Sequence, residues 1–109
     1  MTVDEYNKSQ LVRVAWQYAG KISFPACVAV LFCLRNQVEK NGDNDWLRVT
    51  AQYPLDGFID ARDPDFINVL NVVDSVYDNT RVDTISNDAV YFDGRGERCA
   101  VIGTLILGK

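Results

Sequence analysis

Residues 26–38 read ACVAVLFCLRNQV, and they form the most continuous apolar segment of the chain. Ser23 and Pro25 precede it as a capping residue and a first-turn proline, so the sequence predicts a helix that begins directly after Ser23. The helix is apolar nearly all round, which is typical of a helix at the centre of a domain. Its most apolar part, Ala26–Leu34, is far shorter than the about 20 residues that a membrane-spanning helix needs. We therefore expect a core helix and no membrane span.

Two further helices are predicted on either side of the central one. The first is capped by Ser9, runs through Leu11–Ala19 and ends at Gly20, whose missing Cβ suits a left-handed C-terminal residue. The second has Asp63 as its cap and Pro64 at its first position. Its apolar residues recur at helical spacing on one face: Phe66, Val69, Leu70, Val73, Val76 and Tyr77.

The carboxy-terminal part of the chain changes to strand patterning. Ala89–Phe92 has strand composition, Asp93–Gly96 has turn composition, and Cys99–Leu107 is strand-like again, so we expect a hairpin over residues 89–107. Together with the helices, this predicts an α+β fold that is mostly helical.

Length and composition indicate one compact domain over residues 1–109. Apolar residues make up 48% of the chain and charged residues 24%, a balance that can bury a core. The formal charge is −4, and no lysine or arginine cluster is denser than Arg95 and Arg98, so nucleic acid is excluded as an expected partner. No internal repeat or linker divides the chain.

The absence of histidine limits the chemistry that is available. It removes histidine general bases, serine–histidine and cysteine–histidine nucleophiles and histidine-ligated zinc. Cys27, Cys33 and Cys99 form no C-x-x-C motif, and we expect them to be free thiols that are mostly buried. We expect no cofactor.

The segment between the central and last helices is harder to predict. Asp45–Val49 fits either a short helix or an extended segment, and residues 50–62 are predicted to form an irregular loop. The acids of this loop and of the following helix start are Asp56, Asp60, Asp63 and Asp65. Their spacing matches no calcium loop, so solvated acids are preferred over a metal site, and no metal is predicted.

Six aromatic side chains are candidates for a sugar groove, because flat ring faces stack on the apolar faces of sugars. They are Trp16, Tyr18, Trp46, Tyr53, Tyr91 and Phe92. Core packing is preferred for Trp16 and Phe92, whereas the choice stays open for the tyrosines Tyr18, Tyr53 and Tyr91, whose hydroxyl groups need water or a partner.

The order of the segments carries a family resemblance. The stretches that carry it are Leu11–Gly20, Leu34–Val38, Arg62–Pro64, Asp83–Thr84, Ala89–Phe92 and Val101–Gly103. In this order they resemble the spore cortex-lytic type of bacterial and phage cell-wall hydrolase, a lytic-transglycosylase-like family. The resemblance implies a small lysozyme-like domain that acts on the glycan strands of peptidoglycan.

The resemblance also implies a catalytic glutamate at the end of the first helix, where this sequence has Tyr18. Between Glu5 and Glu39 there is no other acid. A phenol with a pKa of about 10 is a much weaker proton donor than a carboxylic acid tuned to about 6. We therefore expect a catalytically silent domain with a glycan-binding or structural role. The expected substrate-binding residues are Gln17, Tyr53, Asp60, Asp63, Asp88 and Tyr91.

Two alternatives remain open. The first is an active peptidoglycan hydrolase or lytic transglycosylase that uses another acid, with Asp60, Asp63 and Asp88 as candidates. The second is a protein-interaction or regulatory module. The amino terminus has no secretory pattern, so we expect synthesis in the cytoplasm without a signal peptide. A short chain without an export signal would suit a phage or a bacterial accessory gene, so a phage-encoded or virion-associated protein is one expectation.

Overall fold

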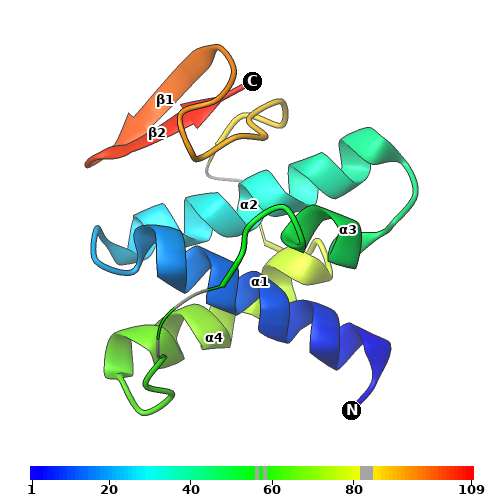
Figure 1. The fold of residues 1–109 in the computed structure, drawn as a ribbon, viewed down its shortest axis with the longest axis vertical. Helices are drawn as coiled ribbons and strands as arrows, with labels where there is room; N and C mark the ends of the chain where they lie inside the picture. Colours follow the sequence, from blue (N-terminus) through cyan, green and yellow to red (C-terminus); the bar gives the residue numbers. More distant parts are fainter. Residues whose placement is uncertain (56, 58, 82–84) are drawn as a thin grey trace.

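The computed structural model of the chain describes residues 1–55, 57, 59–81 and 85–109. It confirms a compact, mostly helical α+β domain, with four helices and a carboxy-terminal antiparallel hairpin in the described residues (Figure 1). The elements are α1 (Val3–Ala19), α2 (Phe24–Asn41), α3 (Trp46–Thr50), α4 (Pro64–Tyr77), β1 (Arg98–Ile102) and β2 (Leu105–Gly108).

Helix α2 is the centre of the domain, as its sequence predicts. Every residue from Ala26 to Val38 is buried, and the helix lies between the hairpin on one side and α1 and α4 on the other (Figure 1). The Ser23 hydroxyl accepts a hydrogen bond from the Ala26 N–H, and Gly42 ends the helix with a φ of 74°. No helix in the described part of the chain is long and apolar enough to cross a membrane.

The cap of helix α1 lies seven residues before the predicted cap at Ser9. This cap is Thr2, whose hydroxyl accepts a hydrogen bond from the Glu5 N–H. Asp4 and Glu5 in the first turn favour this start because they interact well with the positive end of the helix dipole. The predicted left-handed conformation of Gly20 is also wrong, since its φ is −59°. Glycine is required there for space: a Cβ would lie 2.8 Å from the Trp16 ring.

The segment Asp45–Val49, which fits either a short helix or an extended segment from sequence, contributes to helix α3. The Asp45 carboxylate accepts a hydrogen bond from the Arg48 N–H and so caps it. Helix α4 has the predicted cap, with Asp63 accepting from the Asp65 N–H. One member of its predicted apolar face, Leu70, is 45% exposed, because it borders a groove instead of packing in the core.

The hairpin is shorter than predicted. Its strands pair through Val101 with Ile106 and Ile102 with Leu105, and the turn between them lies at Gly103. Residues 89–92 form no strand of this sheet; they make a single bridge, Tyr91 with Gly108. The predicted turn at 93–96 is therefore a loop that leads into β1. Gly94 and Gly96 adopt positive φ angles there, which interrupts extended pairing.

Candidate functional site

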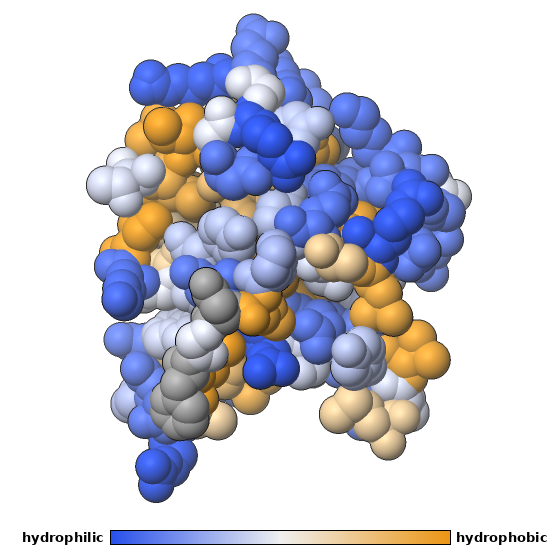
Figure 2. All heavy atoms as spheres, in the orientation of Figure 1, coloured by the Kyte–Doolittle hydropathy of each residue, from blue (hydrophilic) through white to orange (hydrophobic). Residues whose placement is uncertain are grey.

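A shallow groove lies where the end of α1 meets the hairpin, and we call it the Tyr18 groove. Its volume is about 290 Å³. It is lined by Tyr18, Ile22, Phe92, Asp93, Gly94, Thr104, Leu105 and Ile106. Figure 2 shows apolar surface over the hairpin, at the upper left. The cross-strand partners Val101 and Ile106 are about half exposed, so the groove continues into an apolar strand face.

Two aromatic rings, Tyr18 and Phe92, line this groove, and a third ring, Tyr53, packs against both of them. The Tyr18 ring meets Tyr53 edge-on with ring centroids 5.7 Å apart, and meets Phe92 edge-on at 5.2 Å. Tyr53 and Phe92 lie 4.6 Å apart, and both are buried. Such edge-to-face pairs add to the stability of the packed rings, so the Tyr18 ring has a fixed orientation.

The hydroxyl group of Tyr53 is held from two sides. Gln37 Nε2 donates to it at 2.7 Å, and Arg95 Nη2 donates at 3.3 Å. Burial raises the pKa of the Tyr53 phenol, and the Gln37 hydrogen bond opposes that rise. Tyr53 is therefore a neutral structural support behind Tyr18.

Two amide side chains of α2 position the rim of the groove. Asn36 Nδ2 donates to the carbonyl groups of Ser86 and Ala89, at 3.2 and 2.9 Å, and Gln37 Nε2 donates to the carbonyl of Val90. Both amides are buried, so these hydrogen bonds form away from water. They fix the segment that leads to Phe92.

Asp93 is the one carboxylate among the described residues that line the Tyr18 groove. It is paired with Arg95, whose Nε lies 2.9 and 3.1 Å from its two oxygens. The Arg95 guanidinium also lies over the Tyr91 ring, 4.9 Å from its centroid. Hydrogen bonding to Asp93 raises the pKa of Arg95. From sequence, Asp93 was assigned to a turn, and its pairing with Arg95 was not predicted. The signal that could have indicated the pair is an acid two residues before an arginine in a glycine-rich turn.

The aromatic and amide residues predicted for the site have separate positions. Tyr53 packs on Tyr18, while Tyr91 lines an adjacent polar pocket of about 210 Å³ on the other side of Arg95. Gln17 Nε2 donates to the Pro54 carbonyl at 2.6 Å and so ties α1 to the segment that carries Tyr53.

The three candidate acids have local partners, and none of them lines the Tyr18 groove. Asp63 caps α4, and Asp60 lies 3.6 Å from Arg62 Nε. Asp88 is exposed and pairs with Lys109 at 3.4 Å. Its pKa is lowered by a hydrogen bond from the Ser86 hydroxyl and by Lys109. The remaining loop acid, Asp56, and the stretch Asp83–Thr84 lie outside the described residues.

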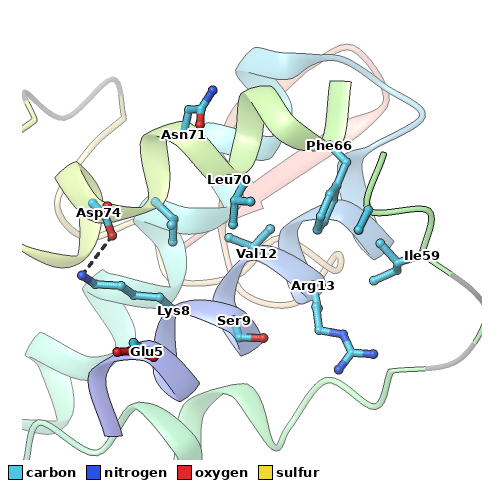
Figure 3. Close-up of a pocket in the computed structure, with 12 residues that line it drawn as sticks. Glu5, Lys8, Ser9, Val12, Arg13, Ile59, Phe66, Leu70, Asn71 and Asp74 are labelled. Atoms are coloured by element: carbon cyan, nitrogen blue, oxygen red, sulfur yellow. Dashed lines mark ion pairs between the residues drawn. The ribbon is translucent and has the colours of Figure 1, made fainter. Parts of the chain in front are cut away.

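A second and larger groove, of about 670 Å³, lies between α1 and α4 (Figure 3), and we call it the α1–α4 groove. Val12 and Leu70 face each other in its middle. Lys8 and Asp74 form an ion pair of 2.9 Å at one end, and Arg13 and Ile59 lie at the other. Sequence did not predict this groove, because it forms between two helices that lie far apart along the chain.

Cysteine and metal chemistry have little support in the described residues. Burial raises the pKa of the Cys27 thiol to about 11 and that of Cys33 to about 12, so both thiols are neutral and unreactive near pH 7. Cys99 is partly exposed, and all three cysteines are free. No group of three or more potential ligands that could hold a metal ion occurs in the part of the chain that the structure describes.

Comparison with known proteins adds no further identification. No protein-family model, no curated protein and no solved structure matches the chain. The fold therefore defines the class, a mostly helical α+β domain with a carboxy-terminal hairpin, and the function has to be argued from the grooves.

Proposed function

We propose that this protein is a catalytically silent, cell-wall-hydrolase-like domain that binds peptidoglycan glycan strands in the Tyr18 groove. One observation carries the proposal: the Tyr18 ring lines an open groove at the end of α1, packed against Tyr53 and Phe92. The family resemblance implies that the proton-donating acid of a glycosidase would occupy this position.

The chemistry of the groove favours binding over cleavage. Glycoside hydrolysis requires a group that protonates the leaving oxygen, and a phenol does this poorly near neutral pH. Asp93, the one carboxylate among the described lining residues, is already engaged as the acceptor of two hydrogen bonds from Arg95. Loss of general acid catalysis alone lowers the rate roughly 10²–10⁴-fold.

The same groove has features that suit a sugar chain. Tyr18 and Phe92 offer aromatic surface, and Ile106 adds an exposed aliphatic side chain beside them. Asp93 and Thr104 supply hydrogen-bonding groups for hydroxyls. Apolar walls with a few fixed polar groups are the usual composition of small-molecule and sugar sites.

Binding is tested by sedimentation with purified peptidoglycan. Asp93→Asn should weaken retention several-fold, because it breaks the Asp93–Arg95 pair at the rim. Asp60→Asn is the matched control, since Asp60 is also followed two residues later by its arginine partner but lies outside the groove. Equal retention of both variants and the wild type would remove the groove as the binding site.

The hydrolase-like shape of the groove is tested by restoring an acid. In Tyr18→Glu, the carboxyl group would lie among Tyr53, Phe92 and Ile22, and these apolar neighbours should raise its pKa towards the working range of a general acid. We expect weak loss of turbidity from a cell-wall suspension. A folded but inactive Tyr18→Glu variant would count against a hydrolase-like groove.

The active-hydrolase alternative is favoured by one observation, the presence of Asp93 in the same groove as Tyr18. If the wild type lyses cell walls, Asp93→Asn should abolish that lysis and Asp60→Asn should not. Lysis that both variants retain would exclude Asp93 as the acid.

A further inference from the structure

The α1–α4 groove has an apolar middle that the domain itself leaves uncovered. Val12 and Val73 are buried at its floor, whereas Leu70 on the α4 side is 45% exposed. Phe66 lines the groove and is supported from behind by an edge-on contact with Trp16, with ring centroids 5.5 Å apart. An apolar occupant would therefore cover the Leu70 side chain, which now faces water.

The two ends of this groove differ in charge. At one end Lys8 is neutralised by Asp74, 2.9 Å away, and Glu5 lies beside this pair (Figure 3). At the other end Arg13 lies next to Ile59, and it has no ion-pair or hydrogen-bond partner within the described ranges 1–55, 57, 59–81 and 85–109. Both described acids of the groove are therefore at the Lys8 end, and the available cation is at the Arg13 end.

From these observations we infer that the α1–α4 groove binds a small amphipathic carboxylate. The apolar chain lies over Val12 and Leu70, and the carboxylate meets Arg13. A volume of about 670 Å³ is in the range of small-ligand sites, roughly 300–1,000 Å³. A guanidinium is the side chain best suited to a planar carboxylate. A second copy of this chain is a poorer occupant, because each copy carries a net charge of −4.

This inference is independent of glycan binding in the Tyr18 groove, because the two grooves share no lining residue. A negative result for carboxylate binding in the α1–α4 groove therefore does not contradict glycan binding in the Tyr18 groove, and the reverse also holds. The probe is decanoate, with decanol and decylammonium as partners that differ only in the head group, all used below the concentration at which they aggregate. Binding is followed by the NMR shifts of the Val12 and Leu70 methyl groups.

The wild type should bind decanoate more tightly than decanol by fivefold or more, and decylammonium should bind worst. Arg13→Gln should weaken decanoate binding by fivefold or more without changing decanol binding. The matched control Arg62→Gln removes an exposed arginine outside the groove and should have no effect. Equal binding of the three probes, or unchanged decanoate binding in Arg13→Gln, would overturn the assignment.

A second pair of variants tests the apolar half of the site. Leu70→Asp should abolish binding, because it places a carboxylate in the middle of the groove. Ile67→Asp is matched in exposure, 39% against 45%, and lies on the same helix but does not line the groove, so it should bind normally. Two results would refute this placement of the ligand. One is that both variants lose decanoate binding although both unfold like the wild type, and the other is that neither variant loses it.

Discussion

Helices α2 and α4 have similar apolar content in their sequences but different surroundings. Helix α2 is buried continuously from Ala26 to Val38, and even its polar residues Asn36 and Gln37 are inside. Helix α4 buries one stripe and leaves Ile67 and Leu70 substantially exposed. The difference indicates that polar residues of α2 are structural, whereas apolar residues of α4 are available for an additional contact.

The largest expected effect is a truncation in the centre of α2. Phe32 is fully buried, so Phe32→Ala should lower the free energy of unfolding by about 3–5 kcal/mol, through lost burial and the cavity left behind. Chemical denaturation measures this directly. A loss below about 1 kcal/mol would mean that α2 is not the tightly packed centre.

Alkaline pH should also destabilise the α2 side of the core. The thiols of Cys27 and Cys33 have folded-state pKa values of about 11 and 12, against 9.0 for a free thiol. Above pH 9 the unfolded chain loses these protons first, so stability falls with rising pH, by up to about 1.4 kcal/mol per unit for each thiol. Unfolding free energies between pH 8 and 10 test this. The Cys27→Ala/Cys33→Ala double variant should flatten the profile, and equal slopes in both proteins would contradict it.

A smaller effect is expected from the buried amide that supports the Tyr18 groove. Gln37→Ala leaves the Val90 carbonyl without its amide donor and removes one of the two donors to Tyr53, so it should cost about 1–3 kcal/mol. Gln52→Ala removes an exposed amide that only contacts Gln37 at 3.4 Å, and should cost less than about 1 kcal/mol. Chemical denaturation of both variants measures this. Similar losses of unfolding free energy in Gln37→Ala and Gln52→Ala would mean that the burial of Gln37 adds nothing to its contribution.

The smallest effects on stability are expected on α4, where two neighbouring residues differ in burial. Val69 is buried and Leu70 is 45% exposed. Val69→Ala should cost about 1–2 kcal/mol, because it removes two buried methyl groups, whereas Leu70→Ala should stay within about 0.5 kcal/mol. Thermal unfolding of the pair measures the difference. If Leu70→Ala lowers the unfolding stability more than Val69→Ala does, Leu70 packs in the protein core and the groove beside it is closed in solution.

Sequence predicted the elements whose signals are local. Ser23 and Pro25 begin α2, and Asp63 begins α4, because caps and first-turn prolines act within one turn. The start of α1 was predicted too late because its cap is Thr2, and Ser9 lies inside the helix.

The hairpin and the grooves depend on contacts between distant parts of the chain. Residues 89–92 have strand composition, yet the carbonyl groups of Ala89 and Val90 accept hydrogen bonds from α2 amides, and the segment meets the sheet only at Gly108. Tyr18 and Tyr53 were predicted as site residues and do make contact. Asp93 was missed because its place in the groove depends on the tertiary contacts that bring it to the same groove as Tyr18 and the hairpin, and no local pattern encodes these contacts.

The Tyr18 groove is proposed to bind glycan strands without cleaving them. Incubating the purified wild-type protein with peptidoglycan, and following sedimentation and turbidity in the same sample, tests both halves at once. We predict co-sedimentation with no loss of turbidity, in the wild type and in Tyr18→Phe alike. Loss of turbidity that persists in Tyr18→Phe, or a protein that stays entirely in the supernatant, would contradict the claim.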